Sequence, residues 1–307
     1  MIDWTDKISI FKKAKDTEEF AEKGFVVVPF LSSDEVVNLL GNYKQFYPNG
    51  VKGFHTTTFE NDVKHREGVD LAIQKVCGSH IENIFKNYQI FFSSFIVKAP
   101  GKESELIVHQ DMTLLDEMKY SGINIWCPLI DLTTENGAIH VLPKSHRLFK
   151  TYRGSSIPDI YDGVVDEVKS VLEPLYLKAG EAVIFDQSII HYSPPNISEV
   201  ERPVINTFVA HEDADIRICY WDKENHPTSI EVFEQKKDFF DKFENFGHDI
   251  FNRPTIGKSL GHYPYDFPKL SREKIEQEYN IVLEKKEKQN DSVKSKGWIK
   301  RMFSRSN

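Results

Sequence analysis

A series of short apolar segments separated by turns, from about residue 89 to residue 210, constrains the fold of this chain more than any other feature. Several short strands at this spacing predict a β-sandwich or a barrel. The clearest segments are Ile90–Lys98, Ser121–Leu129, Gly137–Leu142, Pro174–Leu177, Ala182–Phe185 and Pro203–Ala210.

Helices are expected on both sides of this region, so the predicted class is mainly β with flanking helices (α+β). Ser32 and Glu35 form a capping-box pattern ahead of apolar residues at helical spacing, which predicts a helix there. Other helices are predicted over residues 1–23, Asp70–Tyr88, Ile230–Phe246 and Ser271–Gln289, with loops over residues 50–70 and Asn252–Lys269.

One candidate metal site stands out: His109-Gln110-Asp111, with His191 82 positions later. Alternate side chains of a strand share a face, so His109 and Asp111 can point at one centre. Two imidazoles and one carboxylate form the facial triad of non-haem Fe(II) oxygenases, which leaves metal positions open for a co-substrate and O2. The H-x-D pattern alone is weak evidence in a chain with eleven histidines.

The sequence around His191 strengthens that interpretation. A turn at Gly180-Glu181 precedes the apolar strand Ala182–Phe185, and Pro194-Pro195 follow the histidine and end regular pairing. Arg202 stands eleven residues after His191 and begins another apolar strand. A dicarboxylate bound to a metal at one end needs a cation for its far end, and the planar guanidinium meets a carboxylate with two hydrogen bonds.

Together these motifs resemble the phytanoyl-CoA dioxygenase family of Fe(II)/2-oxoglutarate oxygenases over roughly residues 20–210. The resemblance includes Gly24–Leu31 followed by a helix, Lys98 shortly before the H-x-D, and the segment Asn136–His146 (NGAIHVLPKSH). Lys144 departs from the family, which commonly has glycine at that turn. The departure concerns local geometry more than chemistry.

The resemblance implies a double-stranded β-helix (jelly roll, cupin-like) core and an Fe(II)/2-oxoglutarate-dependent dioxygenase. Such an enzyme uses O2 to hydroxylate an unactivated C–H bond and releases succinate and CO2. Related halogenases have a small residue where this chain has Asp111, so the chain resembles the hydroxylating type.

The resemblance also assigns roles to individual residues. His109, Asp111 and His191 are the expected catalytic metal ligands. Arg202 is the expected partner of the co-substrate, 2-oxoglutarate. Further candidates near the co-substrate are Ser193, Lys98, Trp126 and, more weakly, Asn124.

Other notable side chains have plainer interpretations. His140 and His146 are expected to be structural, because the turn that contains them is a scaffold feature. His55, together with Phe54 and Thr56–Thr58, is a candidate for lining the pocket, since long irregular loops often carry function. The phenylalanines of Ile230–Phe246 are interpreted as core rather than as a substrate lid.

Composition narrows the classes of partner and the compartment. The formal net charge of −8 argues against nucleic acid as a partner. No apolar run approaches the roughly 20 residues that a membrane helix needs, and the N-terminus lacks the pattern of a signal peptide. Three widely separated cysteines do not form a disulfide framework. A cytoplasmic protein is expected.

We expect an oxygenase domain over residues 1–212, a helical C-terminal extension over 213–289 packed on the core, and a basic, partly disordered tail over 290–307. A non-catalytic jelly-roll binding protein is the alternative of another class. Desaturation, epimerisation or cyclisation with the same cofactors also stays open. The substrate is expected to be a small molecule, an acyl carrier or a peptide, and the oligomeric state cannot be read from the sequence.

Overall fold

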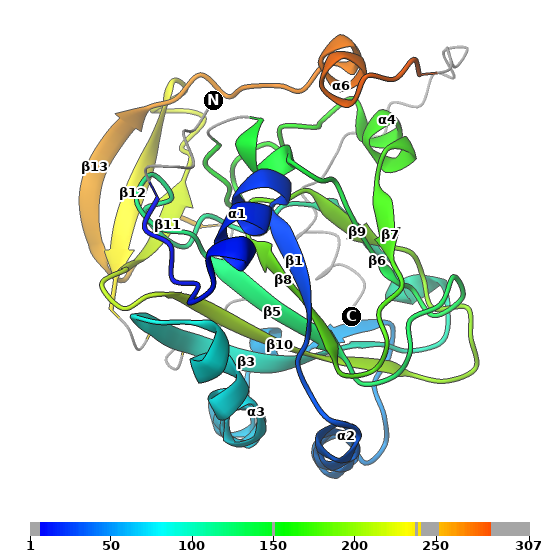
Figure 1. The fold of residues 1–307 in the computed structure, drawn as a ribbon. Helices are drawn as coiled ribbons and strands as arrows, with labels where there is room; N and C mark the ends of the chain where they lie inside the picture. The colour runs from blue at the N-terminus through cyan, green and yellow to red at the C-terminus, as the bar shows by residue number, and fades with distance from the viewer. Residues whose placement is uncertain (1–6, 149–150, 237–238, 241–251, 284–307) are drawn as a thin grey trace.

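The structure is a computed structural model that describes residues 7–148, 151–236, 239–240 and 252–283. Its largest sheet has six antiparallel strands (Figure 1). In spatial order they are β1 (Phe25–Pro29), β8 (Glu181–Asp186), β5 (Ile123–Pro128), β10 (Arg202–His211), β3 (Tyr88–Lys98) and β2 (Phe54–Thr56).

A smaller four-stranded sheet lies across from the large one. Its strands, in spatial order, are β4 (Leu106–His109), β9 (His191–Ser193), β6 (Ile139–Val141) and β7 (Glu173–Leu175). Each of the six strands predicted from the apolar segments is found, and the expected jelly-roll class is confirmed. Two facing sheets enclose the interior in which a ligand site of this fold lies.

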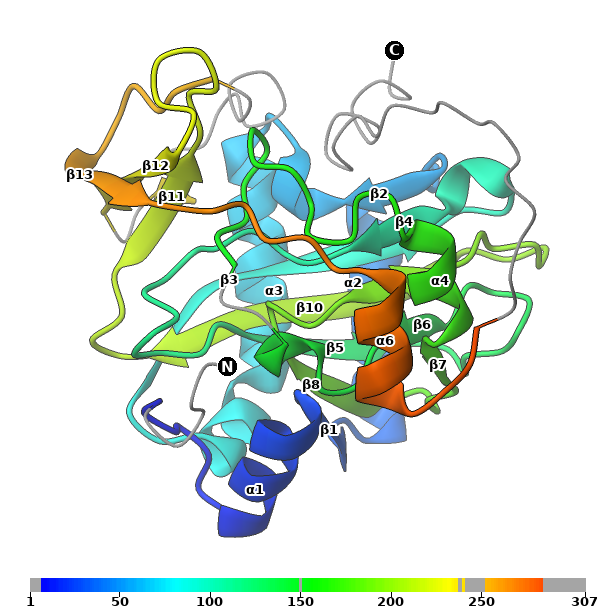
Figure 2. The same cartoon turned by 90° about the horizontal axis from the view of Figure 1, so that it is seen from above.

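Helices cover the outer face of the large sheet (Figure 2). They are α1 (Ala14–Lys23), α2 (Ser33–Phe46) and α3 (Val63–Ile84). The predicted capping box of α2 is confirmed, since the Ser32 side chain accepts from Glu35 N–H and the Glu35 carboxylate accepts from Ser32 N–H. Leu39 and Ile73 from the helices pack against alternate sheet residues such as Phe95 and Ile205. The other sheet residues therefore face the interior between the sheets.

The N-terminal third differs from expectation in three places. The first helix begins at Ala14, residues 7–13 are not helical, and residues 1–6 lie outside the described part. The predicted loop over 50–70 contains β2, a short 3-10 helix (Thr57–Phe59) and the start of α3. Helix α3 begins early because the Asp62 side chain caps it by accepting from His65 N–H. It ends at Ile84, before the predicted Tyr88.

In its described residues the C-terminal extension contains three strands and one α-helix, so its predicted helical character is wrong. It contains a three-stranded sheet of β11 (Ile216–Tyr220), β12 (Ser229–Gln235) and β13 (Lys258–Pro264). The helix predicted over Ile230–Phe246 is a strand at its beginning, and most of its remainder lies outside the described residues. The loop predicted over Asn252–Lys269 contains β13.

The cause of the error is that β12 is buried on both faces. Ile230 and Val232 join one apolar cluster, and Phe233 joins another with Met112 and Phe240. A strand covered on both sides lacks the alternation that marks a half-exposed strand. Helix α6 (Arg272–Tyr279) ends with Asn280 in the left-handed conformation, and residues 284–289 of the predicted helix lie outside the described part of the chain. It packs with α4 (Val165–Ser170) against the small sheet.

Candidate metal centre and its cavity

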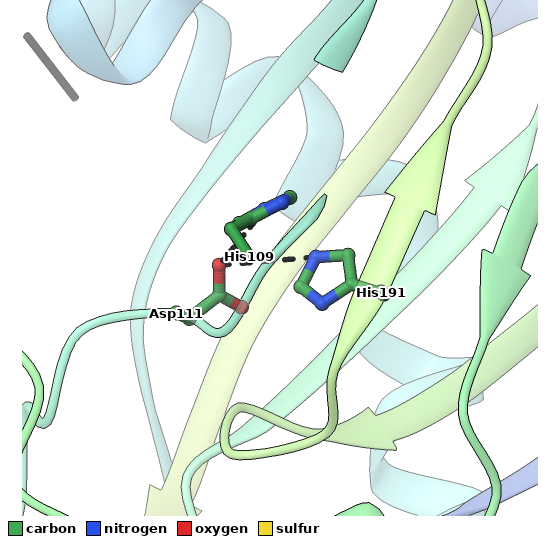
Figure 3. A group of neighbouring side chains, drawn as sticks. All are labelled: His109, Asp111 and His191. Carbon is green, nitrogen blue, oxygen red and sulfur yellow. Dashed lines mark ion pairs between the residues drawn. The ribbon is translucent and has the colours of Figure 1, made fainter. Parts of the chain in front are cut away.

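The three predicted metal ligands converge at one end of the small sheet (Figure 3). His109 ends β4 and pairs directly with His191 at the start of β9, and Asp111 follows two residues after His109. The Asp111 Oδ1 atom lies 3.8 Å from His109 Nε2 and 4.0 Å from His191 Nε2. All three ligand atoms lie within 4.8 Å of one another.

The donor types fit a divalent metal ion. Ligand atoms that are each about 2.1 Å from one ion and at right angles to one another lie about 3.0 Å apart, so each carboxylate–imidazole separation would shorten by about 1 Å on metal binding. The set of two imidazoles and one carboxylate is that of non-haem Fe(II) sites.

Hydrogen bonds fix which nitrogen of each imidazole can bind a metal. His109 Nδ1 lies 2.8 Å from the carbonyl oxygen of Ile107, and His191 Nδ1 lies 3.0 Å from that of Ile189. A carbonyl only accepts, so each Nδ1 carries the proton and each Nε2 presents its lone pair. Burial, followed by the neighbouring His191, lowers the pKa of His109 well below its ordinary value. Both effects keep the ring neutral, as metal binding requires.

Asp111 is held by residues from three other elements. Its Oδ2 atom accepts from Asn124 Nδ2 on β5 at 2.8 Å, and its backbone carbonyl accepts from Arg153 Nε at 2.6 Å. Its backbone N–H donates to Gln187 O at 3.0 Å. Burial raises the pKa of Asp111 above its ordinary value. These contacts fix the carboxylate in position beside the two imidazoles.

Asn124 and Arg153 therefore differ from what the sequence predicts. Asn124 is a predicted co-substrate contact, but in the structure it bonds to the carboxylate of Asp111. Arg153 is missed, because it lies in an irregular segment with no motif around it. Its guanidinium forms a buried ion pair with Glu117. Burial acts to lower the pKa of Arg153, but the Glu117 carboxylate outweighs burial and raises that pKa.

The three predicted metal ligands open onto a cavity between the two sheets, with about 1080 Å³ of empty space including its mouth. Predicted site residues that line it are Asn124, Trp126, Ser193 and Arg202. Most of the other lining side chains are apolar, among them Phe54, Phe92, Phe185, Phe208 and Phe240. Such a wall excludes bulk water and strengthens electrostatic interactions within.

Arg202 is the most informative member of this lining. The residue is 1% exposed, and its guanidinium lies 5.2 Å from the ring centroid of Trp126. Within the described residues, its Nε and Nη1 atoms have no hydrogen-bond partner, and no carboxylate forms an ion pair with it. Burial lowers the pKa of Arg202 to about 9. A buried guanidinium without a counter-ion fits an anionic ligand such as the far carboxylate of 2-oxoglutarate.

Lys98 does not line the cavity, although it pairs with Arg202 across β3 and β10. Its Nζ donates to the backbone carbonyls of Ser193 at 3.0 Å, Pro194 at 2.9 Å and Ser104. Burial, followed by the nearby Arg202 charge, lowers the pKa of Lys98 well below its usual range. In the structure it fixes the end of β9, where Ser193 lies.

The plainer interpretations have mixed outcomes. His146 is buried with Nε2 3.2 Å from Ala21 O, and His140 bonds to Ala138 O, so both serve the scaffold as predicted. Phe54, Thr56 and Thr58 line the cavity, but His55 instead bonds to Glu60. Phe240 both packs in the core and lines the cavity.

Lys144, which departs from the family pattern, has a φ of 69° in the left-handed region. The side chain there is strained relative to glycine.

Comparison with known proteins gives one consistent result. The pattern of the family described as "Phytanoyl-CoA dioxygenase (PhyH)" matches residues 20–204. Phytanoyl-CoA dioxygenase 1 of Oryza sativa subsp. japonica is 28% identical over 208 residues, which cover 64% of this chain and 72% of that protein. Phytanoyl-CoA dioxygenase domain-containing protein 1 of Danio rerio is 26% identical over 215 residues, which cover 67% of this chain and 66% of that protein.

Among solved structures, the non-heme alpha ketoglutarate dependent carbocyclase SnoK from nogalamycin biosynthesis superposes with a TM-score of 0.50 at 20% identity. The match covers 67% of this chain and 87% of that one, and it shows a shared fold.

None of the helices in the described ranges is both long enough and apolar enough to span a bilayer.

Proposed function

Because the chain belongs to the phytanoyl-CoA dioxygenase family and is an Fe(II)- and 2-oxoglutarate-dependent oxygenase that uses O2, we propose that it hydroxylates an unactivated C–H bond of a small-molecule substrate. Succinate and CO2 are the expected co-products. The observation that carries this proposal is one cavity lined both by the three metal ligands and by a buried guanidinium without a counter-ion.

In this proposal His109, Asp111 and His191 hold the iron through two Nε2 atoms and one carboxylate. The bound iron supplies the activation of O2 and the cleavage of the C–H bond, which side chains alone cannot perform. A complete triad with Asp111 favours hydroxylation over halogen transfer, because the carboxylate occupies the position that a halide needs.

Arg202 binds the far carboxylate of 2-oxoglutarate, and the Trp126 ring beneath the guanidinium keeps it in place. Ser193 lies two residues after His191 on the same strand face, and its hydroxyl offers a further donor to that carboxylate. Lys98 acts on this site as a positioning residue, through the carbonyls at the end of β9.

Asn124 and Arg153 are positioning residues for the metal ligand Asp111. Partners of this kind orient a ligand and typically change metal affinity 10- to 100-fold when removed. The apolar walls keep water from the reacting centre, so that the charge of Arg202 acts at low local dielectric.

The test combines binding and turnover. Anaerobic titration of the purified chain with Fe(II), followed by 2-oxoglutarate, is expected to show one site for each. Succinate release is then screened across acyl, amino-acid and peptide compounds. His109→Ala is the control and is expected to lose metal binding and succinate release together. Wild-type protein that binds metal no better than this variant contradicts the assignment.

We also propose the domain division stated above: an oxygenase domain over residues 1–212, an extension over 213–289 packed on it, and a tail over 290–307. The shared apolar cluster of Met112, Phe233 and Phe240 supports packing of the extension on the core.

All three cysteines are buried and unpaired, which supports a reducing compartment such as the cytoplasm.

A further inference from the structure

The face of the large sheet that lines the cavity changes in character along strands β3 and β10. At one end, Arg202 pairs with Lys98; in the middle, Asn206 pairs with Ser94; at the other end, Phe208 pairs with Phe92. Alternate strand residues share a face, so these three pairs lie along the same wall, with the Val204–Ile96 pair between the first and the second. The first pair belongs to the proposed co-substrate end, which leaves the other two for the primary substrate.

The middle pair carries buried polar atoms that lack partners. Asn206 and Ser94 both line the cavity and are 7% and 1% exposed. Neither Asn206 Oδ1 nor Ser94 Oγ has a hydrogen-bond partner in the part of the chain that the structure describes. Leaving such a group unpaired is unfavourable, so two such atoms on neighbouring strands of one wall call for a ligand that pairs with them.

The orientation of the Asn206 amide follows from the metal ligand. Ionised Asp111 only accepts, so Asn124 must turn its Nδ2 toward it, at 2.8 Å. Asn124 Oδ1 then accepts from Asn206 Nδ2 at 3.0 Å, which leaves the oxygen of Asn206 as the unpaired atom. The wall therefore presents a hydrogen-bond acceptor, two hydrogen bonds away from a metal ligand.

Gln187 is a second amide beside the site whose nitrogen is bonded and whose oxygen, within the described residues, is not. Its Nε2 donates to the Glu117 carboxylate at 2.5 Å, and its Oε1 has no partner among the described residues. Gln187 also lines the cavity. Two amides are thus held with their nitrogen atoms on protein acceptors and their oxygen atoms unpaired, an arrangement that selects for donors.

Charge on the substrate is disfavoured. Among the described lining residues, the ionisable side chains are the metal ligands, Tyr192 and Arg202. Asp111 is committed to the metal and Arg202 to the co-substrate, so neither an ammonium nor a second carboxylate would find a counter-ion. A buried charge without one is strongly disfavoured.

The far end of the cavity is apolar and is partly built by the extension. Its side chains are Phe59, Phe92, Met112, Leu114, Phe208 and Phe240. Phe92 and Phe240 pack with ring centroids 4.7 Å apart. Met112 and Leu114 follow the metal ligand Asp111 in the chain, so this apolar end adjoins the metal centre.

We infer that the primary substrate is an uncharged, mainly apolar molecule with a hydroxyl or primary amide that donates to Asn206 Oδ1 and accepts from the Ser94 hydroxyl. This inference rests on the proposed function, because it takes the metal and Arg202 as the co-substrate end. The donor fixes the polar end of the substrate, and the phenylalanine-rich end holds its apolar body. The reacting C–H bond then lies near the metal.

The test uses probes that share one apolar body, the adamantyl cage, and differ in one group. These are 1-adamantanemethanol, 1-adamantanecarboxamide, the methyl ether of the alcohol, 1-adamantanecarboxylate and 1-adamantanemethylamine. Binding is measured by calorimetry on the full chain with Mn(II) and 2-oxoglutarate, which avoids turnover. We expect the alcohol and the amide to bind at least fivefold more tightly than the ether and at least tenfold more tightly than both charged probes.

Variants connect that preference to the two residues. Asn206→Leu is expected to reduce the alcohol-to-ether ratio to below two, because it removes the acceptor, and Ser94→Ala is expected to weaken alcohol binding at least threefold. Thr58→Val, which removes another hydroxyl of the cavity lining, is the matched control and is expected to keep the wild-type ratio, because Thr58 Oγ1 already accepts from Thr56.

Equal binding of alcohol and ether, tighter binding of a charged probe, or no probe binding by protein that binds 2-oxoglutarate overturns the inference. An unchanged ratio in Asn206→Leu, or unchanged alcohol binding by Ser94→Ala, does so too. Protein that binds neither Mn(II) nor 2-oxoglutarate instead overturns the proposed function on which the inference rests.

Discussion

Arg202 and Arg153 are both buried arginines beside the same cavity, and we predict that the same substitution has opposite effects at the two positions. Arg153 has a carboxylate partner in Glu117. Arg202 has no ion-pair partner among the described residues. Replacement by methionine keeps much of the side-chain length and removes the charge. It therefore separates a satisfied cation from one that requires a ligand.

The magnitude for Arg202 follows from its burial. A pKa lowered from 12.5 to about 9 corresponds to about 5 kcal/mol of destabilisation of the charged form. The contact of the guanidinium with the Trp126 ring offsets part of that cost. We therefore expect Arg202→Met to raise the free energy of unfolding of the ligand-free protein by about 2 kcal/mol, within the range seen when buried charges are replaced by apolar side chains.

Arg153→Met should act in the other direction. It leaves the Glu117 carboxylate buried without its cation and removes the donor to the Asp111 carbonyl. Breaking a buried pair in this way costs about 3–5 kcal/mol. Urea unfolding of both variants, in metal-free buffer at neutral pH, measures the two values directly.

Ligand binding completes the comparison. Loss of a buried charge pair costs roughly 2–5 kcal/mol of affinity, so Arg202→Met should bind 2-oxoglutarate at least about 30-fold more weakly. At a co-substrate concentration of 100 Kd the wild type gains about 2.7 kcal/mol, which cancels the advantage of the variant. If Arg202→Met destabilises the ligand-free protein as Arg153→Met does, Arg202 is already satisfied and the assigned anion site is wrong.

Three further predictions concern the metal ligand, a turn and a buried imidazole. Asn124→Leu removes the donor to Asp111 Oδ2 and should weaken Mn(II) binding 10- to 100-fold in an anaerobic titration; unchanged affinity would show that Asn124 does not orient the carboxylate. Lys144→Gly relieves a left-handed non-glycine residue and should raise the free energy of unfolding by about 0.5–1 kcal/mol, whereas Lys144→Ala should give no gain. His146 is buried, and burial lowers its pKa from 6.5 to about 4, so protonation favours the unfolded chain. As pH falls from 7 to 5 this residue should therefore cost about 2 kcal/mol of stability, and the cost should be absent from His146→Asn. Equal pH dependence of wild type and variant in urea unfolding would contradict that assignment.

The sequence predicts the parts of this site that depend on local pattern. His109 and Asp111 share a strand face through their spacing, and the turn before β8 together with the prolines after β9 place His191 at a strand end. The strands themselves are predicted because their apolar runs are short and bounded by turns.

Prediction from the sequence fails where a residue contacts partners that are distant in the sequence. It also fails where burial on both faces removes the polar–apolar alternation of a strand. Arg153 reaches Asp111 and Glu117 from an irregular segment, and nothing within a few residues of it indicates that contact. Strand β12 is buried on both faces, and its Val232, together with Phe239, Phe243 and Phe246 further along the sequence, is consistent with helical spacing. Lys98 matches a family position, yet only the fold shows that its ammonium is used by backbone carbonyls.

The residues proposed for the reaction and some of those proposed for substrate specificity lie in different parts of the chain. The family match ends at residue 204 and contains all three metal ligands and Arg202. Two residues of the substrate end, Phe208 and Phe240, lie beyond it, and Phe240 shares an apolar cluster with Phe233 of β12 in the extension. A relative with the same ligands but another C-terminal segment would keep the reaction and lose this wall. Substrate choice is therefore expected to follow the extension, which is the part of the sequence that the resemblance does not cover.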